Sequence, residues 1–200
     1  MTTRYEYYQE LKALAREIRE KYQLGDCRIL PSTLRKILLE EGVDHIDLRP
    51  FKNVRGLYIS DQNGASVAVN KSLPRDPKAF TLGHELKHHL LDSAAGPLHC
   101  DDMNTSEKIE IGAEVFAAEL LFPEEMFENF MREMQITRGL CTPEDLVRIK
   151  LQTDTTLSYA GLCKRACYLQ YAAPEIFDNV RWRDLERTIL FRHSYSRHRT

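Results

Sequence analysis

Two histidines and a glutamate stand close together in the stretch His84-Glu85-Leu86-Lys87-His88. On a helix of about 3.6 residues per turn, the imidazoles of His84 and His88 project from one face and can bind one metal ion. Glu85 is turned about 100° away from His84, so its carboxylate can reach a metal-bound water without being a ligand. The pattern predicts a catalytic zinc site with Glu85 as the general base of a hydrolysis.

A site of this kind needs a third protein ligand and leaves a fourth position open for water. Candidates lie in a helix predicted over residues 105–121, which opens with Ser and Thr cap candidates and ends before Pro123. Glu110 and Glu114 share one face of that helix with inward-facing apolar residues. Buried carboxylates need partners, which a zinc ion and the ring N–H of a ligating histidine would supply. We therefore predict Glu110 as the ligand and Glu114 as the residue that orients a histidine.

Together the two motifs resemble the ImmA/IrrE family of bacterial and phage metallopeptidases, which carry an FTLAHELGH-like helix and then an ExEANxFAAELLMP-like helix. Here they read Phe80-Thr81-Leu82-Gly83-His84-Glu85-Leu86-Lys87-His88 and Glu110-(x)3-Glu114-Val115-Phe116-Ala117-Ala118-Glu119-Leu120-Leu121-Phe122-Pro123. The resemblance spans roughly residues 50–125. It implies His84, His88 and Glu110 as zinc ligands, Glu85 as the base, and a zincin-like fold.

Three positions depart from the family pattern. Gly83 replaces the usual Ala, and Lys87 replaces the usual Gly, which puts a cation near the site or out in solvent. Gly112 stands where a second Glu is common, and Glu114 falls where the family usually has Asn or Asp. The sequence therefore leaves open whether Glu110 or Glu114 is the third ligand, although the spacing to Pro123 favours Glu110.

Periodicity along the chain predicts an α+β fold, mostly helical, with a small three-stranded sheet. The expected strands cover residues 43–48, 56–60 and 65–70. Helices are expected over 5–22, 31–42, the HExxH segment, 105–121, 126–134, 143–151 and 157–169. We expect residues 1–140 to form a zincin-like metallopeptidase domain with N-terminal helices. A C-terminal helical region with a basic tail would occupy residues 141–200.

The strand over residues 65–70 ends just before the HExxH helix. We expect it to be an edge strand whose residues Val67, Ala68 and Val69 align an extended peptide substrate by backbone hydrogen bonds. An ordinary core strand is the alternative that the sequence leaves open.

Stabilising the oxyanion of a peptide hydrolysis would require a second electrophile. The candidates are Tyr58, His99 and Tyr159, and the sequence does not choose among them.

The composition is that expected of an intracellular enzyme. The chain has 200 residues, 42% hydrophobic and 29% charged, with a net charge of −2 that names no partner. No apolar run has transmembrane length, and the first residues lack a signal-peptide core, so we expect a cytoplasmic location without membrane contact. Five cysteines, an odd number, indicate reduced thiols rather than a disulfide framework. Cys163 and Cys167 could form half of a metal site, but ordinary thiols are the favoured interpretation.

The C-terminal part is basic, with ten Lys and Arg residues against five Asp and Glu residues over 148–200. Its two helices across a short turn permit a helix-turn-helix-like interpretation, which would allow DNA contact. A helical pair that only closes the fold is favoured over it. The basic tail over 181–199 could also touch an acidic partner.

The leading expectation is a zinc-dependent endopeptidase. The family resemblance implies one protein substrate, a helix-turn-helix repressor that is cut to induce phage, mobile-element or stress-response genes. The alternative is a non-catalytic regulatory binding module that engages a repressor or DNA and keeps its metal site as structure. Glu85 favours the enzyme, because a purely structural site has no use for a carboxylate beside an open position.

Overall fold

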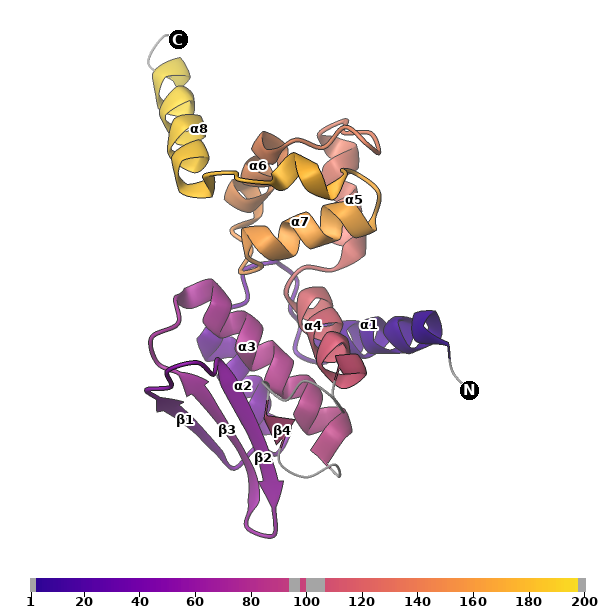
Figure 1. Ribbon diagram of the computed structural model, residues 1–200, viewed down its shortest axis with the longest axis vertical. Coiled ribbons are helices and arrows are strands. Elements are labelled where there is room, and N and C mark those ends of the chain that lie inside the picture. Colours follow the sequence, from indigo (N-terminus) through magenta and orange to yellow (C-terminus); the bar gives the residue numbers. More distant parts are fainter. Residues whose placement is uncertain (1–2, 94–97, 100–106, 198–200) are drawn as a thin grey trace.

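The computed structural model describes residues 3–93, 98–99 and 107–197 of the chain (Figure 1). Its helices are α1 (Arg4–Lys21), α2 (Pro31–Glu40), α3 (Arg75–Lys87), α4 (Glu107–Leu121), α5 (Glu124–Glu133), α6 (Pro143–Thr153), α7 (Tyr159–Tyr168) and α8 (Trp182–Arg197). A π-helical turn (His88–Asp92) continues α3, and a 3-10 turn (Pro174–Phe177) precedes α8. The strands are β1 (His45–Arg49), β2 (Gly56–Asp61), β3 (Gly64–Asn70) and β4 (Leu98–His99). The predicted α+β class is confirmed.

Several helix starts follow directly from local sequence. Thr3 caps α1 and Thr142 caps α6, each in a capping box with the acidic residue three positions later. Pro31 and Pro143 occupy the first turns of α2 and α6, where the backbone N–H that proline lacks would have no hydrogen-bond partner within the helix. These signals explain why the predicted helix starts agree with the observed ones to within a few residues.

The sheet is mixed, with strand order β1-β3-β2-β4. β2 and β3 form an antiparallel hairpin across the turn at Gln62 and Asn63, and Gly64 closes it with a φ of +114° that favours glycine. β1 pairs with β3 in parallel, and the two-residue β4 adds to the outer side of β2. All three predicted strands are present.

The position of β3 corrects one expectation. Val67 pairs with Ile46 on one side and Tyr58 on the other, so β3 lies between two strands. Its backbone N–H and C=O groups are used within the sheet, and it cannot align a peptide as an edge strand. The prediction that Val67, Ala68 and Val69 bind substrate in this way is wrong, and the core-strand alternative is correct. Strand order is set by non-local pairing, which the alternation of residues along one strand does not reveal.

Helices cover one face of the sheet. α3 packs on β2 and β3, and α2 packs beside it toward β1 (Figure 1). Side chains of β2 and β3 that point to these helices are buried, including Tyr58, Val67 and Val69, and they meet Leu82 and Leu86 of α3 in one core cluster. Buried and less buried side chains alternate along both strands, as in a sheet with one covered face. The face of α3 that carries Leu82 and Leu86 is used against this sheet, so other contacts of α3 use its remaining faces.

α4 packs against both α1 and α3, which places it beside the HExxH helix. Figure 1 shows α5, α6 and α7 grouped on the side of α4 away from the sheet, with α8 projecting from that group. Buried residues before and after position 140, such as Phe127 and Tyr171, belong to one core cluster, with their ring centroids 6.1 Å apart. The sequence predicted a basic tail at the C-terminus, and its described part is the helix α8. None of the described helices combines the length and the apolar character needed to cross a membrane.

Candidate metal centre

The two histidines of the HExxH motif face each other at the C-terminal end of α3. His84 lies in the last turn of α3, and His88 begins the π-helical turn. Their Nε2 atoms are 3.0 Å apart, and their rings meet at 68°. The side chain of His88 is fully buried, whereas 12% of the His84 side chain is exposed. The pair directs two ring nitrogens to one point, as the sequence predicts.

α4 brings Glu110 to the same point. Oε2 of Glu110 lies 3.0 Å from Nε2 of His84, and Oε1 lies 3.5 Å from Nε2 of His88. Small residues face each other where the two helices meet, and a Cβ on Gly83 would be in ordinary van der Waals contact with that of Ala117, at 3.5 Å. Within the described residues, these three are the one His/Cys/Asp/Glu group whose ligand atoms all lie within 4.8 Å of one another.

Glu114 does not join this group. Its carboxylate accepts a hydrogen bond from Nζ of Lys164 at 2.9 Å, and 48% of its side chain is exposed. One helical turn, about 6 Å along the axis, separates it from Glu110 and moves it toward α7. The structure therefore contradicts the predicted orienting role of Glu114 on a histidine. It also brings Glu110, rather than Glu114, to the two rings.

The three side chains fit a divalent metal ion. Tetrahedral Zn²⁺ with bonds of about 2.0–2.1 Å holds its ligand atoms about 3.3 Å apart. The separations of 3.0 Å and 3.5 Å between the offered atoms bracket that value. Oε1 of Glu110 is also buried without a hydrogen-bond donor among the described residues. A buried carboxylate oxygen is costly unless a donor or a cation satisfies it, so the site suits a cation.

Local electrostatics favour the protonation states that bind metal. Burial lowers the pKa of His88 below its ordinary value and outweighs the opposing hydrogen bond to Asp92. Burial alone would raise the pKa of Glu110, but the hydrogen bond to His84 and the charges of both histidines outweigh it and lower that pKa. His88 is therefore neutral and Glu110 ionised near neutral pH, as metal binding requires.

Two residues that sequence reasoning did not place in the site support His88. Oδ2 of Asp92 lies 2.8 Å from Nδ1 of His88, one helical turn away. Nζ of Lys87 donates to the same oxygen at 2.6 Å, and the Lys87 side chain is fully buried. The sequence left open whether Lys87 faced the site or solvent, and the fold directs it inward. An acidic residue four positions after a motif histidine was the available signal for Asp92.

Glu85 is fully buried between α3 and the start of β2. A Cβ built on Gly56 would overlap both the Glu85 carboxylate and the methyl group of Thr81, which shows that these groups lie directly beside Gly56. The assignment of Glu85 as the general base stays a prediction.

The hydroxyl of Tyr58, an oxyanion candidate, has a hydrogen-bond partner in the fold, and its role at the oxyanion stays a prediction. Its hydroxyl hydrogen-bonds Nδ1 of His89 at 3.1 Å, while Nε2 of His89 donates to the carbonyl oxygen of Glu41 at 2.9 Å. The Tyr58 side chain is fully buried, so this hydroxyl is held inside the core between β2 and the π-helical turn. His99 pairs with Leu57 through the backbone of β4, but its side chain lies outside the described residues.

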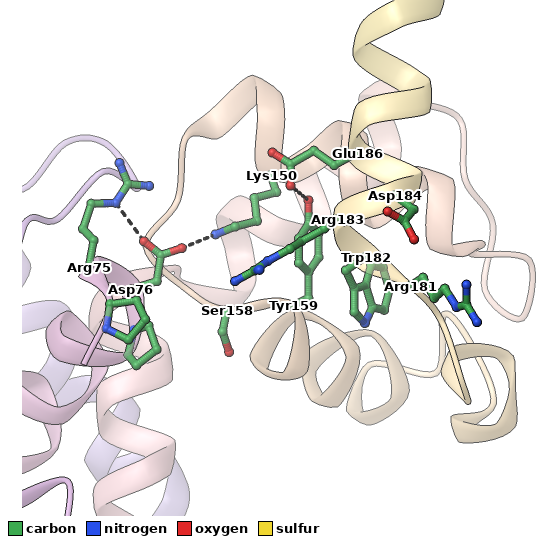
Figure 2. A pocket seen from close by; sticks show the side chains of 12 residues that line it. Arg75, Asp76, Lys150, Ser158, Tyr159, Arg181, Trp182, Arg183, Asp184 and Glu186 are labelled. Atoms are coloured by element: carbon green, nitrogen blue, oxygen red, sulfur yellow. Dashed lines mark hydrogen bonds and ion pairs between the residues drawn. The ribbon is translucent and has the colours of Figure 1, made fainter. Parts of the chain in front are cut away.

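Tyr159 lies elsewhere in the fold. It stacks on Trp182 with ring centroids 4.6 Å apart, and its hydroxyl donates to Glu186 at 3.1 Å. Figure 2 shows these side chains in a pocket of about 760 Å³ that α6, α7 and α8 form with the first residues of α3, including Arg75. Along α3, Arg75 and His84 are about 13 Å apart. The structure therefore does not bring Tyr159 to the metal centre.

The described cysteines are free thiols, and none belongs to the metal group. Burial raises the pKa of Cys163 to about 12 and also raises that of Cys167. The fifth cysteine, Cys100, lies outside the described residues. The thiol interpretation of these cysteines agrees with this environment.

A comparison with curated protein sequences found no match. The chain does match the family model described as the IrrE N-terminal-like domain, a peptidase family, over residues 43–166. The matched segment begins just before β1 and ends in α7, so it contains the whole sheet, α3 with both histidines, and α4 with Glu110. The match covers more than half of the chain and predicts a peptidase with a metal at its centre, which the His-His-Glu group can hold. This chain therefore belongs to the IrrE N-terminal-like family of metallopeptidases.

Proposed function

We propose that this protein is a zinc-dependent endopeptidase in which His84, His88 and Glu110 hold the metal and Glu85 is the general base. The observation that carries the proposal is the convergence of both Nε2 atoms and the Glu110 carboxylate from two separate helices on one point. Two nitrogen ligands and one carboxylate form the set that zinc peptidases use when they keep one coordination position open.

The residues divide the chemistry among them. A zinc ion bound there would supply Lewis acidity, which polarises a scissile carbonyl and makes water a stronger acid. Glu85 is next to His84 in sequence and shielded from bulk water, and it takes the proton of the attacking water and delivers it to the leaving amine. His88 keeps Nε2 as its lone-pair nitrogen because Nδ1–H donates a hydrogen bond to Asp92.

The choice of zinc rests on the ligand types. Imidazole nitrogens with one carboxylate suit Zn²⁺ best among the common divalent ions, although manganese and iron bind similar sets. Zinc in proteins is usually tetrahedral, and the ligand spacing of that geometry agrees with the separations of 3.0 Å and 3.5 Å among the three atoms.

The proposed substrate is a helix-turn-helix repressor, and this part of the proposal rests on the family resemblance alone. Groups at a metal centre specify hydrolysis, and they do not specify which protein is cut. Extended substrates of peptidases often pair with a sheet edge. In this protein β3 cannot offer that edge, because both of its sides are occupied.

Elemental analysis of the parent protein and of His88→Ala, both purified without added metal, tests the proposal. We expect about one zinc per chain in the parent and loss of most of it in the variant. Incubation with candidate repressors, followed by mass spectrometry, should then show a single cut by the parent only. A parent that takes up no metal even when zinc is offered would refute the proposal and favour a regulatory binding module.

A further inference from the structure

Lys87 is a fully buried cation inside the HExxH motif. Its Nζ atom donates to Oδ2 of Asp92 at 2.6 Å and to the carbonyl oxygen of Ile109 at 3.2 Å. A buried ammonium group is costly unless it is paired and hydrogen-bonded, and these two acceptors take two of its three N–H groups. The surroundings of the Lys87 side chain therefore suit a charged group better than an apolar one.

The acceptor oxygen of Asp92 is shared with His88. Oδ2 lies 2.8 Å from Nδ1 of His88, so one carboxylate oxygen receives both the ammonium and the ring N–H. The carboxylate sits at the end of the π-helical turn. Of the two contacts that hold this oxygen, one is to a metal-ligand candidate and the other is to Lys87.

The second acceptor of Lys87 belongs to the other helix of the site. Ile109 lies in the first turn of α4, directly before Glu110. The ammonium of Lys87 therefore links the π-helical turn that carries His88 to the turn of α4 that carries the carboxylate candidate.

We propose that Lys87 is a positioning residue of the metal centre, which holds Asp92 on the ring of His88 and ties the first turn of α4 to the end of α3. This inference rests on the proposed metal-binding function. The resemblance to known metallopeptidases does not supply it, because glycine is usual at this position in that family. In this chain a long buried side chain replaces glycine and uses its charge to fix the partner of a ligand.

The charge of Lys87 and its positioning role have opposite expected effects on metal affinity. A positive charge near a divalent ion opposes binding of that ion, so removing the charge alone would tighten metal binding. If Lys87 acts by positioning, its removal must instead weaken binding, because the ring of His88 and the turn before Glu110 lose their support. The two roles of the side chain thus predict opposite changes in metal affinity.

The test is the affinity of the full-length protein for Zn²⁺ and Co²⁺, measured by competition with a chromophoric chelator, for the parent and for Lys87→Met. We expect a loss of about tenfold or more in affinity, typical for removal of a group that supports a ligand. The visible absorption spectrum of bound Co²⁺ should also shift, since it reports the arrangement of the ligands. A change in fold stability alone would not alter that spectrum.

Lys12→Met is the matched control. Lys12 is also a buried lysine in an ion pair, with Glu124 at 2.7 Å, but it lies in α1 and donates to Tyr168 at 3.3 Å, away from the metal group. Its removal should lower the free energy of unfolding and leave metal affinity and the Co²⁺ spectrum unchanged.

A double-mutant cycle with Asp92→Asn tests whether Lys87 acts through Asp92. We expect the combined loss in metal affinity to be smaller than the product of the two single losses, because the variants disrupt one network. Independent losses would overturn the proposed route. If Lys87→Met does not fold, Lys87→Gln, which keeps a hydrogen-bond donor without the charge, serves in the same cycle.

The outcomes separate the two proposals. A parent protein that binds neither Zn²⁺ nor Co²⁺ would refute the proposed function. A parent that binds metal, together with a Lys87→Met variant of equal or higher affinity and unchanged Co²⁺ spectrum, would refute only the positioning role.

Discussion

Gly56 at the start of β2 lies directly against the carboxylate of Glu85 on α3, so closely that a Cβ on Gly56 would overlap Oε1 of Glu85. The same Cβ would overlap Cγ2 of Thr81, one turn earlier on α3. The absence of a side chain at position 56 is therefore a condition for the observed placement of Glu85. This relationship joins the sheet to the proposed base, and it is not part of any motif in the sequence.

Gly56→Ala should displace the Glu85 side chain. The methyl group cannot occupy its position unless Glu85 and Thr81 move, and a small misplacement of a catalytic group reduces rates by roughly 100-fold. We expect a loss of that order in peptide hydrolysis, with zinc content unchanged, because the atoms nearest to a Cβ at position 56 belong to Glu85 and Thr81 and not to a ligand candidate.

Gly83→Ala is the control for that variant. A Cβ at position 83 would lie 3.5 Å from Ala117, an ordinary van der Waals contact, and alanine stabilises a helix by roughly 1 kcal/mol relative to glycine. Activity and zinc content should stay at the parent level. Equal activity in the two alanine variants would contradict the role of Gly56.

Glu85→Gln should abolish hydrolysis while keeping the metal. The amide has the same shape but cannot take a proton from water, and loss of a general base reduces rates by roughly 10²–10⁴-fold. The comparison needs cleavage rates and elemental analysis on the same preparations. A variant that cuts at the parent rate would rule out Glu85 as the base.

Glu110→Ala and Glu114→Ala test which glutamate is the third metal ligand, a choice that the sequence left open. Only Glu110 lies within 3.5 Å of both histidine Nε2 atoms, so its loss should empty the site. Glu114 pairs with Lys164 at the surface, where an exposed ion pair contributes about 0–1 kcal/mol to stability. Zinc content that falls in Glu114→Ala and stays intact in Glu110→Ala would reverse this assignment.

Cys27 should make the fold less stable at alkaline pH. Burial raises the pKa of its thiol from 9.0 to about 11 in the folded protein. As the pH rises from about 9 to about 11, the unfolded chain loses this proton first and is favoured. The stability that the protonated Cys27 thiol contributes is therefore complete below pH 9 and is lost as the pH rises toward 11. The free energy of unfolding should have fallen by roughly 2 kcal/mol at pH 10.5 from this cause.

Urea unfolding at pH 8 and pH 10.5 measures this effect. Cys27→Ala lacks the thiol, so the free energy of unfolding should fall less between the two pH values than it does in the parent. Equal falls in the two proteins would show that the Cys27 thiol does not titrate as expected.

Much of the fold could be predicted from short stretches of sequence. The helix expected over 143–151 is α6, which Thr142 caps, and the strands expected over 56–60 and 65–70 are β2 and β3, which a tight turn joins. Helix starts and tight turns depend on hydrogen bonds and backbone preferences within a few residues, so the information lies in the local sequence. The basic tail was not predicted as helix, although α8 forms there, because its pattern of charges suggested only a partner.

The spacing of the HExxH motif determined that His84 and His88 share one face, because helix geometry fixes the relation of residues four apart. The structure adds that their Nε2 atoms lie 3.0 Å apart. Three other features were decided only by the tertiary structure. They are the approach of Glu110 rather than Glu114, the inward direction of Lys87, and the central place of β3 in the sheet. Each depends on how α4 packs on α3 or on which strands pair. Such contacts join residues far apart in the chain, and they are selected by the summed packing of the whole core, which no short stretch of sequence contains.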